Sequence, residues 1–105
     1  MTALEKIRIC AEAMEMPNVK AHAHRVTYRY FWDADERTYD PIHFDHQAMA
    51  LKKTFKLSDS AHHNDIDGTD WIVTHKFGAE SMSHELNEAI VDCVVQIVTE
   101  KKQAA

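Results

Sequence analysis

Residues 83–102 have the sequence SHELNEAIVDCVVQIVTEKK, which decides the fold. Apolar side chains recur there at spacings of three and four residues, the period of one helix face. Because the apolar stripe is wide, we expect this helix to be well buried or to pack on two sides. Acidic Glu85 and Glu88 near its start and basic Lys101 and Lys102 near its end suit the helix dipole. The apolar positions of the stripe are Leu86, Ile90, Cys93, Val94, Ile97 and Val98.

A β-hairpin is predicted directly before this helix. Residues 71–77 alternate along the chain and are rich in β-forming residues, so they predict a strand. Residues 55–62 are weakly strand-like, and the segment 64–68 between them ends in Asp-Gly, the strongest turn signal in the chain. We therefore expect the two strands to pair in an antiparallel hairpin.

Two further helices are predicted in the first half of the chain. Thr2 and Glu5 form a capping box in front of an amphipathic helix over residues 3–15. Asp40-Pro41 has the composition of an N-cap followed by the first helical residue, which predicts a second helix over 42–54.

A strand over Ala21–Trp32 lies between these helices, because its β-forming residues alternate. One face of it would carry an aromatic stripe, typical of a core, and the other face two arginines. The stripe consists of Val26, Tyr28, Tyr30 and Trp32. Together the elements predict one α+β domain over residues 1–105, in the order α-β-α-β-β-α. Its small three-stranded antiparallel sheet would be layered with the three helices.

The composition is that of a globular protein with an acidic surface. Of the 105 residues, 45% are hydrophobic and 28% charged, which suits one domain. The 17 acidic residues outnumber the 12 basic ones, and the formal net charge is −5. This charge disfavours general nucleic-acid binding and an anionic membrane surface. It would suit a basic surface on a protein partner.

The cysteines and the apolar segments indicate the compartment. Cys10 and Cys93 lie far apart on apolar faces of predicted helices, so we expect buried free thiols. Charged residues interrupt residues 1–14, which argues against a signal peptide. The most apolar stretch, 89–98, contains Asp92 and is too short to span a bilayer. These features together predict a reducing cytosol.

A cationic patch is the candidate ligand site. Arg25 and Arg29 on the first predicted strand have the same phase as Thr74 and Lys76 on the last. If these strands pair, the side chains would converge and hold a phosphate or carboxylate. Aromatic residues nearby could stack on a base, unless they lie in the core. The candidate residues are Arg25, Tyr28, Arg29, Trp71, Thr74 and Lys76.

Histidine pairs are the candidate metal site. Two histidines share a strand face, and two more lie three residues apart near the start of a helix. Imidazole pairs can bind zinc, although no His-Glu-x-x-His or Cys/His framework is present. The pairs are His22 with His24 and His43 with His46.

Catalytic motifs are missing from the sequence. It contains no Gly-x-Ser-x-Gly, and its two glycines, Gly68 and Gly78, cannot build a glycine-rich phosphate loop. We therefore expect a protein that is not an enzyme and that uses no cofactor.

The second half of the chain resembles the phage ABA sandwich domain, a family of small proteins of tailed phages and prophages. The resemblance rests on 39–41 (YDP), 48–51 (AMAL), 55–57 (FKL), 71–73 (WIV) and 86–91 (LNEAIV), in that order. With the first helix it covers roughly residues 3–102, and it implies helices layered on an antiparallel sheet and a phage origin. The family supplies no catalytic residue to transfer. The aromatic strand and the numerous histidines depart from its pattern.

Three functions follow as expectations. The first is a non-enzymatic phage accessory protein that binds a host protein in the host cytoplasm, for example as a counter-defence inhibitor. The alternatives are a protein that sequesters a nucleotide-type signal at the cationic patch and a histidine-based metal-binding protein. A homodimer is expected as well, because a sheet this small has exposed edges that a second copy would cover.

Overall fold

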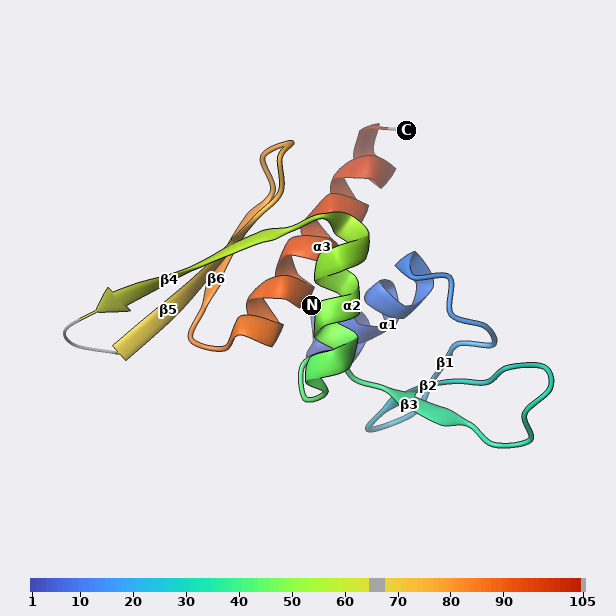
Figure 1. Cartoon of the computed structure of the whole chain (residues 1–105). Coiled ribbons are helices and arrows are strands. Elements are labelled where there is room, and N and C mark those ends of the chain that lie inside the picture. Colours follow the sequence, from blue (N-terminus) through green and yellow to red (C-terminus); the bar gives the residue numbers. More distant parts are fainter. Residues whose placement is uncertain (65–67, 105) are drawn as a thin grey trace.

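The computed structural model describes residues 1–64 and 68–104, and it has an α+β fold (Figure 1). The helices are α1 (Ala3–Ala13), α2 (Asp45–Phe55) and α3 (Leu86–Ala104). The strands are β1 (Lys20–Ala21), β2 (Val26–Tyr28), β3 (Arg37–Tyr39), β4 (Ser58–Asn64), β5 (Gly68–Thr74) and β6 (Glu80–Ser83). The predicted fold class is therefore confirmed.

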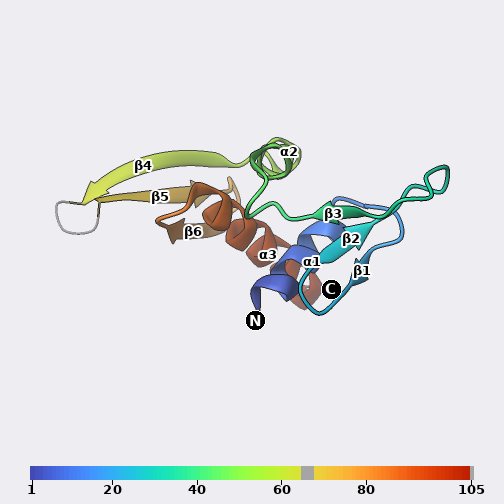
Figure 2. The ribbon, with the colours of Figure 1, turned by 90° about the horizontal axis from the view of Figure 1, so that it is seen from below.

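The prediction of a single sheet is wrong. The strands form two separate antiparallel sheets, in the orders β1-β2-β3 and β4-β5-β6. Figures 1 and 2 show the first sheet near α1 and the second at the other end of the molecule. The chain has a radius of gyration of 14.4 Å, whereas a globule of this length has about 13 Å. The molecule is therefore elongated, with the two sheets at its ends.

The predicted strand 21–32 is divided by a turn. The backbone N–H of His22 donates to the carbonyl of Arg25 at 2.8 Å, so the chain reverses between β1 and β2. Alternation of residue types does not reveal such a reversal, because both halves keep the same period. After Tyr28 the chain leaves the sheet, and β3 brings it back at Arg37.

The hairpin predicted before the last helix is confirmed, with different ends. Seven residues of β4 pair with seven of β5, from Ser58↔Thr74 to Asn64↔Gly68. Residues 65–67 of the predicted turn lie outside the described residues. The strand predicted to reach Phe77 ends at Thr74, where a turn closed by His75 and Gly78 leads into the unpredicted β6.

The residues directly before α1 and α2 determine where each of these helices begins. The capping box of Thr2 and Glu5 is present, as predicted, at the start of α1. Helix α2 begins at Asp45 instead of residue 42, because Asp40 forms a turn of its own. Its carbonyl accepts from the N–H of Phe44 at 2.8 Å, so Asp40-Pro41 opens the turn before the helix.

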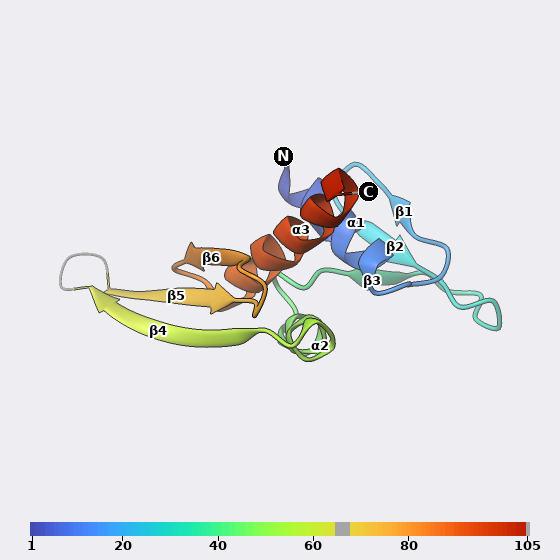
Figure 3. The same cartoon turned by 90° about the horizontal axis from the view of Figure 1, so that it is seen from above.

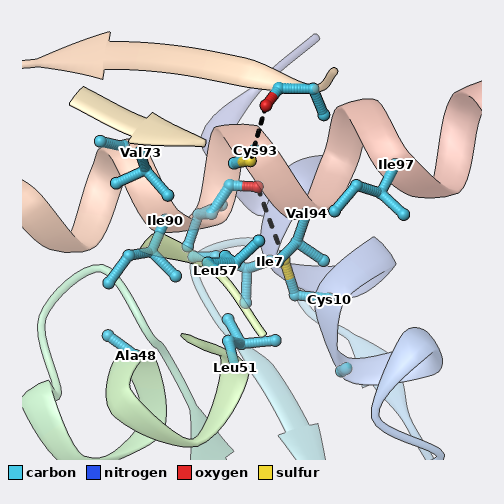
Figure 4. Packing of buried hydrophobic residues seen from close by; sticks show 14 of the residues in the cluster. Ile7, Cys10, Ala48, Leu51, Leu57, Val73, Ile90, Cys93, Val94 and Ile97 are labelled. Carbon is cyan, nitrogen blue, oxygen red and sulfur yellow. Dashed lines mark hydrogen bonds between the residues drawn. The ribbon is translucent and has the colours of Figure 1, made fainter. Parts of the chain in front are cut away.

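Helix α3 is the central element and packs on two sides, as its wide stripe predicts. It contacts α1 and α2 as well as β5 and β6. Figure 4 shows the core around it, with Val73 of β5, Leu51 of α2 and Ile7 of α1 in one cluster. Five successive or near-successive residues of α3 have no exposed surface: Ala89, Ile90, Val91, Cys93 and Val94.

Both cysteines are free and buried, as predicted. The Cys10 thiol lies 4.0 Å from the carbonyl oxygen of Val91, and the Cys93 thiol 3.9 Å from that of Ala79. Burial raises the pKa of Cys10 to about 12 and that of Cys93 to about 11. Both thiols therefore stay protonated in the folded chain well above pH 9, which is the ordinary pKa of a thiol.

Because the pKa values of these thiols are raised, we expect the fold to lose stability at alkaline pH. Below pH 9 both states of the chain keep the thiol protons. Between pH 9 and the raised values only the unfolded chain releases them, so the free energy of unfolding falls as the pH rises. The slope is up to about 1.4 kcal/mol per pH unit for each thiol. Urea unfolding at a series of pH values measures it, and Cys10→Ala should make the slope shallower. An identical slope in that variant would contradict the linkage.

A second prediction about stability concerns the buried side chain of Tyr39. Its side chain is 1% exposed, and its hydroxyl has no hydrogen-bond partner among the described protein groups. A buried hydroxyl without a partner costs about 1–3 kcal/mol. Tyr39→Phe should therefore leave the free energy of unfolding unchanged or raise it by about 1 kcal/mol. Urea unfolding at neutral pH is the measurement, and a loss above about 1 kcal/mol would show that the hydroxyl is hydrogen-bonded.

Candidate functional site

An exposed aromatic loop connects β2 to β3. We call residues 29–36 the aromatic loop; it contains Tyr30, Phe31 and Trp32 in succession. Phe31 is 88% exposed and Trp32 70% exposed, although side chains of this kind are usually buried. Figures 2 and 3 show the loop projecting at the end of the molecule opposite the β4–β5 hairpin.

The aromatic rings of the loop stack on one another. The ring centroids of Tyr30 and Trp32 lie 4.7 Å apart with nearly parallel planes, and Phe31 meets Trp32 edge-on at 4.9 Å. Tyr28 contacts Tyr30 at 5.6 Å and buried Tyr39 at 6.3 Å. The rings thus form a continuous series from the core to the tip of the loop. Such pairs contribute about 0.5–1.5 kcal/mol each and fix the orientation of the exposed rings.

Asp33 fixes the turn that follows the aromatic residues. Arg37 donates to one oxygen of this carboxylate from Nε at 3.2 Å and from Nη2 at 3.1 Å. The backbone N–H of Asp35 donates to the other oxygen at 3.0 Å. These contacts lower the pKa of Asp33 below its ordinary value, and the hydrogen bond from the Asp35 N–H is the largest cause. The Arg37 guanidinium also lies 5.9 Å from the centre of the Tyr30 ring.

The base of the aromatic loop is attached to the segment after α1. The backbone N–H of Arg29 donates to the carbonyl of Pro17 at 3.0 Å. The side-chain amide of Asn18 donates to the carbonyl of Arg29 at 2.8 Å. Hydrogen bonds therefore tie the loop to the rest of the fold at its base and at its turn.

The predicted cationic patch does not form. Arg25, Tyr28 and Arg29 belong to the region of the β1-β2-β3 sheet, whereas Thr74 lies in β5 of the other sheet. Lys76 follows Thr74 and lies 5.0 Å from the Phe77 ring. The strands predicted to bring these residues together do not pair, so their expected convergence is wrong.

Trp71 lies in β5 with Thr74, whereas Arg25, Tyr28 and Arg29 lie in or beside a strand of the other sheet. It is half-buried in an open groove between α2, the start of α3 and β5. Met49 and Leu86 line this groove with it, together with the acidic residues Asp45 and Glu85. Acidic neighbours do not favour a phosphate or carboxylate ligand at this position.

A cleft of about 350 Å³ lies between α1 and the β2–β3 hairpin. Arg25 and Lys6 line it, and so do the carboxylates of Asp40 and Glu88. Lys6 is already paired with Asp92 at 2.8 Å, a contact that raises the pKa of the lysine. The cleft therefore has mixed charge, which does not favour a highly charged nucleotide.

The histidines of the two predicted pairs contact different neighbouring side chains. His22 Nε2 lies 3.0 Å from the Thr27 hydroxyl and 3.5 Å from the Glu36 carboxylate. His43 Nδ1 lies 2.7 Å from the Asp40 carboxylate, and the His46 ring stacks on Phe44. His24 and His43 line the same cleft. Within residues 1–64 and 68–104, however, no three His, Cys, Asp or Glu residues gather as a metal site requires.

The sequence contained one sign of the aromatic loop. Adjacent residues of a strand point to opposite faces, so Phe31 and Trp32 could not both lie in the core of a sheet covered on one side. Together with the two aspartates that follow, Asp33 and Asp35, this run is typical of an exposed turn.

Across the described part of the chain, every helix is too short or too polar to cross a membrane. Comparison with protein-family models, with curated proteins and with solved structures finds no match.

Proposed function

We propose that this chain is a small non-enzymatic binding protein that holds a protein partner through its aromatic loop. The observation that carries the proposal is the exposure of Phe31 and Trp32 on a loop whose rings are already stacked. Burial of the two side chains by a partner would remove apolar surface from water, at about 25 cal/mol per Å².

The composition of the loop fits the centre of a protein interface. Tryptophan, tyrosine and arginine are the residues that most often dominate binding energy, and here Trp32, Tyr30 and Arg37 lie together. Because the stacking and the Asp33 contacts fix the loop beforehand, less conformational entropy is lost on binding. Charged residues around the rings, such as Arg29 and Asp35, would form a polar rim.

The resemblance to the phage ABA sandwich family supports a more specific setting. In that setting the partner is a protein of the bacterial host, the site of action is the host cytoplasm, and inhibition of a host defence protein is the form of activity we propose. The sequestration of a nucleotide-type signal has less support, because its six candidate residues lie in or beside strands of two separate sheets.

The proposal is tested by capturing partners from a bacterial lysate with three forms of the chain. These are the wild type, Trp32→Ala and the matched control Phe77→Ala. Phe77 is 80% exposed, in the turn between β5 and β6, and thus offers a similar apolar surface elsewhere on the molecule. We expect one protein to be retained by the wild type and by Phe77→Ala and lost from Trp32→Ala.

A spectroscopic titration then places the contact on the loop. In a Trp71→Phe chain the only remaining tryptophan is Trp32. Its emission should shift to shorter wavelength when the purified partner is added, because the ring leaves water. An unshifted emission with intact binding would overturn the proposal. The proposal would also be overturned if the chain sedimented with anionic lipid vesicles through this loop and bound no protein.

A further inference from the structure

Strand β4 is the long free edge of the described sheets. It has seven residues and pairs only with β5, because the order of its sheet is β4-β5-β6. Figures 1 and 3 show β4 along the outer side of this sheet. The edges formed by β1, β3 and β6 have two, three and four residues. Short strands are one way in which proteins protect an edge, and β4 lacks this protection.

The residues of β4 do not block pairing either. The strand contains no proline, lysine or arginine, which are the residues that usually protect an edge. Its one acidic residue, Asp59, is paired with Lys52 of α2. Ser60, Ala61, His62 and His63 are exposed. An exposed edge of this length offers unpaired backbone N–H and C=O groups to another strand.

We propose that β4 pairs antiparallel with β4 of a second copy of this chain, around a two-fold axis at Ala61. The two sheets would then join into one continuous sheet of six strands. The structure places the aromatic loop at the other end of the molecule, so the second copy leaves that loop free (Figure 2).

The sequence of β4 is complementary to itself in this register. With Ala61 opposite Ala61 of the second copy, Asp59 lies opposite its His63 and Ser60 opposite its His62. The Asp59 carboxylate, which Lys52 of the same copy also contacts, thus faces an imidazole twice, once on each side of the axis, and small Ala61 lies at the centre. Shifting the axis to His62 places two imidazoles opposite each other, and shifting it to Ser60 removes the Asp59–His63 pair. Hydrogen-bonding pairs across neighbouring strands stabilise a sheet, so the Ala61 register is favoured.

Engineered cysteines test both the pairing and its register. Residues directly opposite in antiparallel strands have Cα atoms about 4.5–5.5 Å apart, which a disulfide can bridge. Ala61→Cys should therefore form a covalent dimer with oxidised glutathione as the oxidant. In Ser60→Cys the two thiols would be offset by two residues along the strands, with Cα atoms about 8 Å apart, too far for a disulfide. The native thiols are fully buried, so the new thiol is the reactive one.

The expected result is a band of twice the monomer mass for Ala61→Cys and none for Ser60→Cys. Sedimentation velocity adds a readout that needs no oxidation: the wild type should dimerise, and His63→Glu, which would face Asp59, should be a monomer. Equal crosslinking of both cysteine variants, or a monomeric wild type at all concentrations, would overturn the proposal. Trp32→Ala should leave the dimer intact, so failure of the partner proposal and failure of this one are distinguishable.

Discussion

Ile90→Ala should lower the free energy of unfolding by about 2–5 kcal/mol, the largest loss of stability that we expect from a truncation. Ile90 has no exposed surface and belongs to the central helix α3. Figure 4 shows it in the cluster that also holds Val73 of β5 and Ala48 of α2. Removing its side chain would leave a cavity where helices and a sheet meet, and such a cavity collapses only in part.

Urea unfolding at neutral pH measures this loss, with two variants for comparison. Ile90→Val removes one methylene group and should cost about 0.5–1.5 kcal/mol. Met82→Ala removes an exposed side chain from β6 and should change stability by no more than about 0.5 kcal/mol. A loss below about 1 kcal/mol for Ile90→Ala would contradict the central position of α3.

The same helix should make the two sheets unfold together. The sheets lie at different ends of the molecule, and α3 is the element that contacts both α1 and the β5–β6 pair. Trp32 lies beside one sheet and Trp71 in the other. Within each single-tryptophan chain, the emission of the remaining tryptophan and the far-UV circular dichroism of the helices should therefore show the same urea midpoint, as a two-state transition requires.

The helices could be predicted from the sequence because their signals are local. The capping box at Thr2 begins α1, and the wide stripe around Ile90 places α3 at the centre of the core. The sheets could not be predicted as well, because strand pairing is decided by residues far apart in the chain. A turn from His22 to Arg25 is enough to separate β1 from β2 and to exclude the predicted long strand.

The same limit explains the candidate site. The expected convergence of Arg29 with Lys76 depended on a pairing between strands that belong to different sheets. Alternation predicts that Tyr28, Tyr30 and Trp32 face the core and places Phe31 on the opposite face of the strand. The structure shows Tyr28 half-buried, whereas Phe31 and Trp32 lie outside any strand and are exposed. The aromatic loop is therefore identified as a candidate binding surface from the tertiary structure and not from a sequence motif.

Phe31→Ala combined with Trp32→Ala should weaken binding of the captured partner by about 2–4 kcal/mol, or roughly 30- to 700-fold in Kd. Both side chains lie at the tip of the aromatic loop, where they are 88% and 70% exposed in the free chain. A partner that covers the loop would bury them at the centre of the interface, where truncation is most costly. Isothermal titration calorimetry with the purified partner measures the change.

The binding loss should be separate from any loss of stability, and this separation identifies the loop as a binding surface. The two side chains contribute to folding through the contacts of Trp32 with Tyr30 and with Phe31, so the free energy of unfolding should fall by no more than about 3 kcal/mol. Phe77→Ala removes an equally exposed ring from the turn between β5 and β6 and should leave Kd unchanged. A structural role would give the opposite pattern, in which the double variant unfolds readily and binds normally once folded. Equal weakening by Phe77→Ala would instead indicate nonspecific apolar adhesion, because the position of the ring would then not matter.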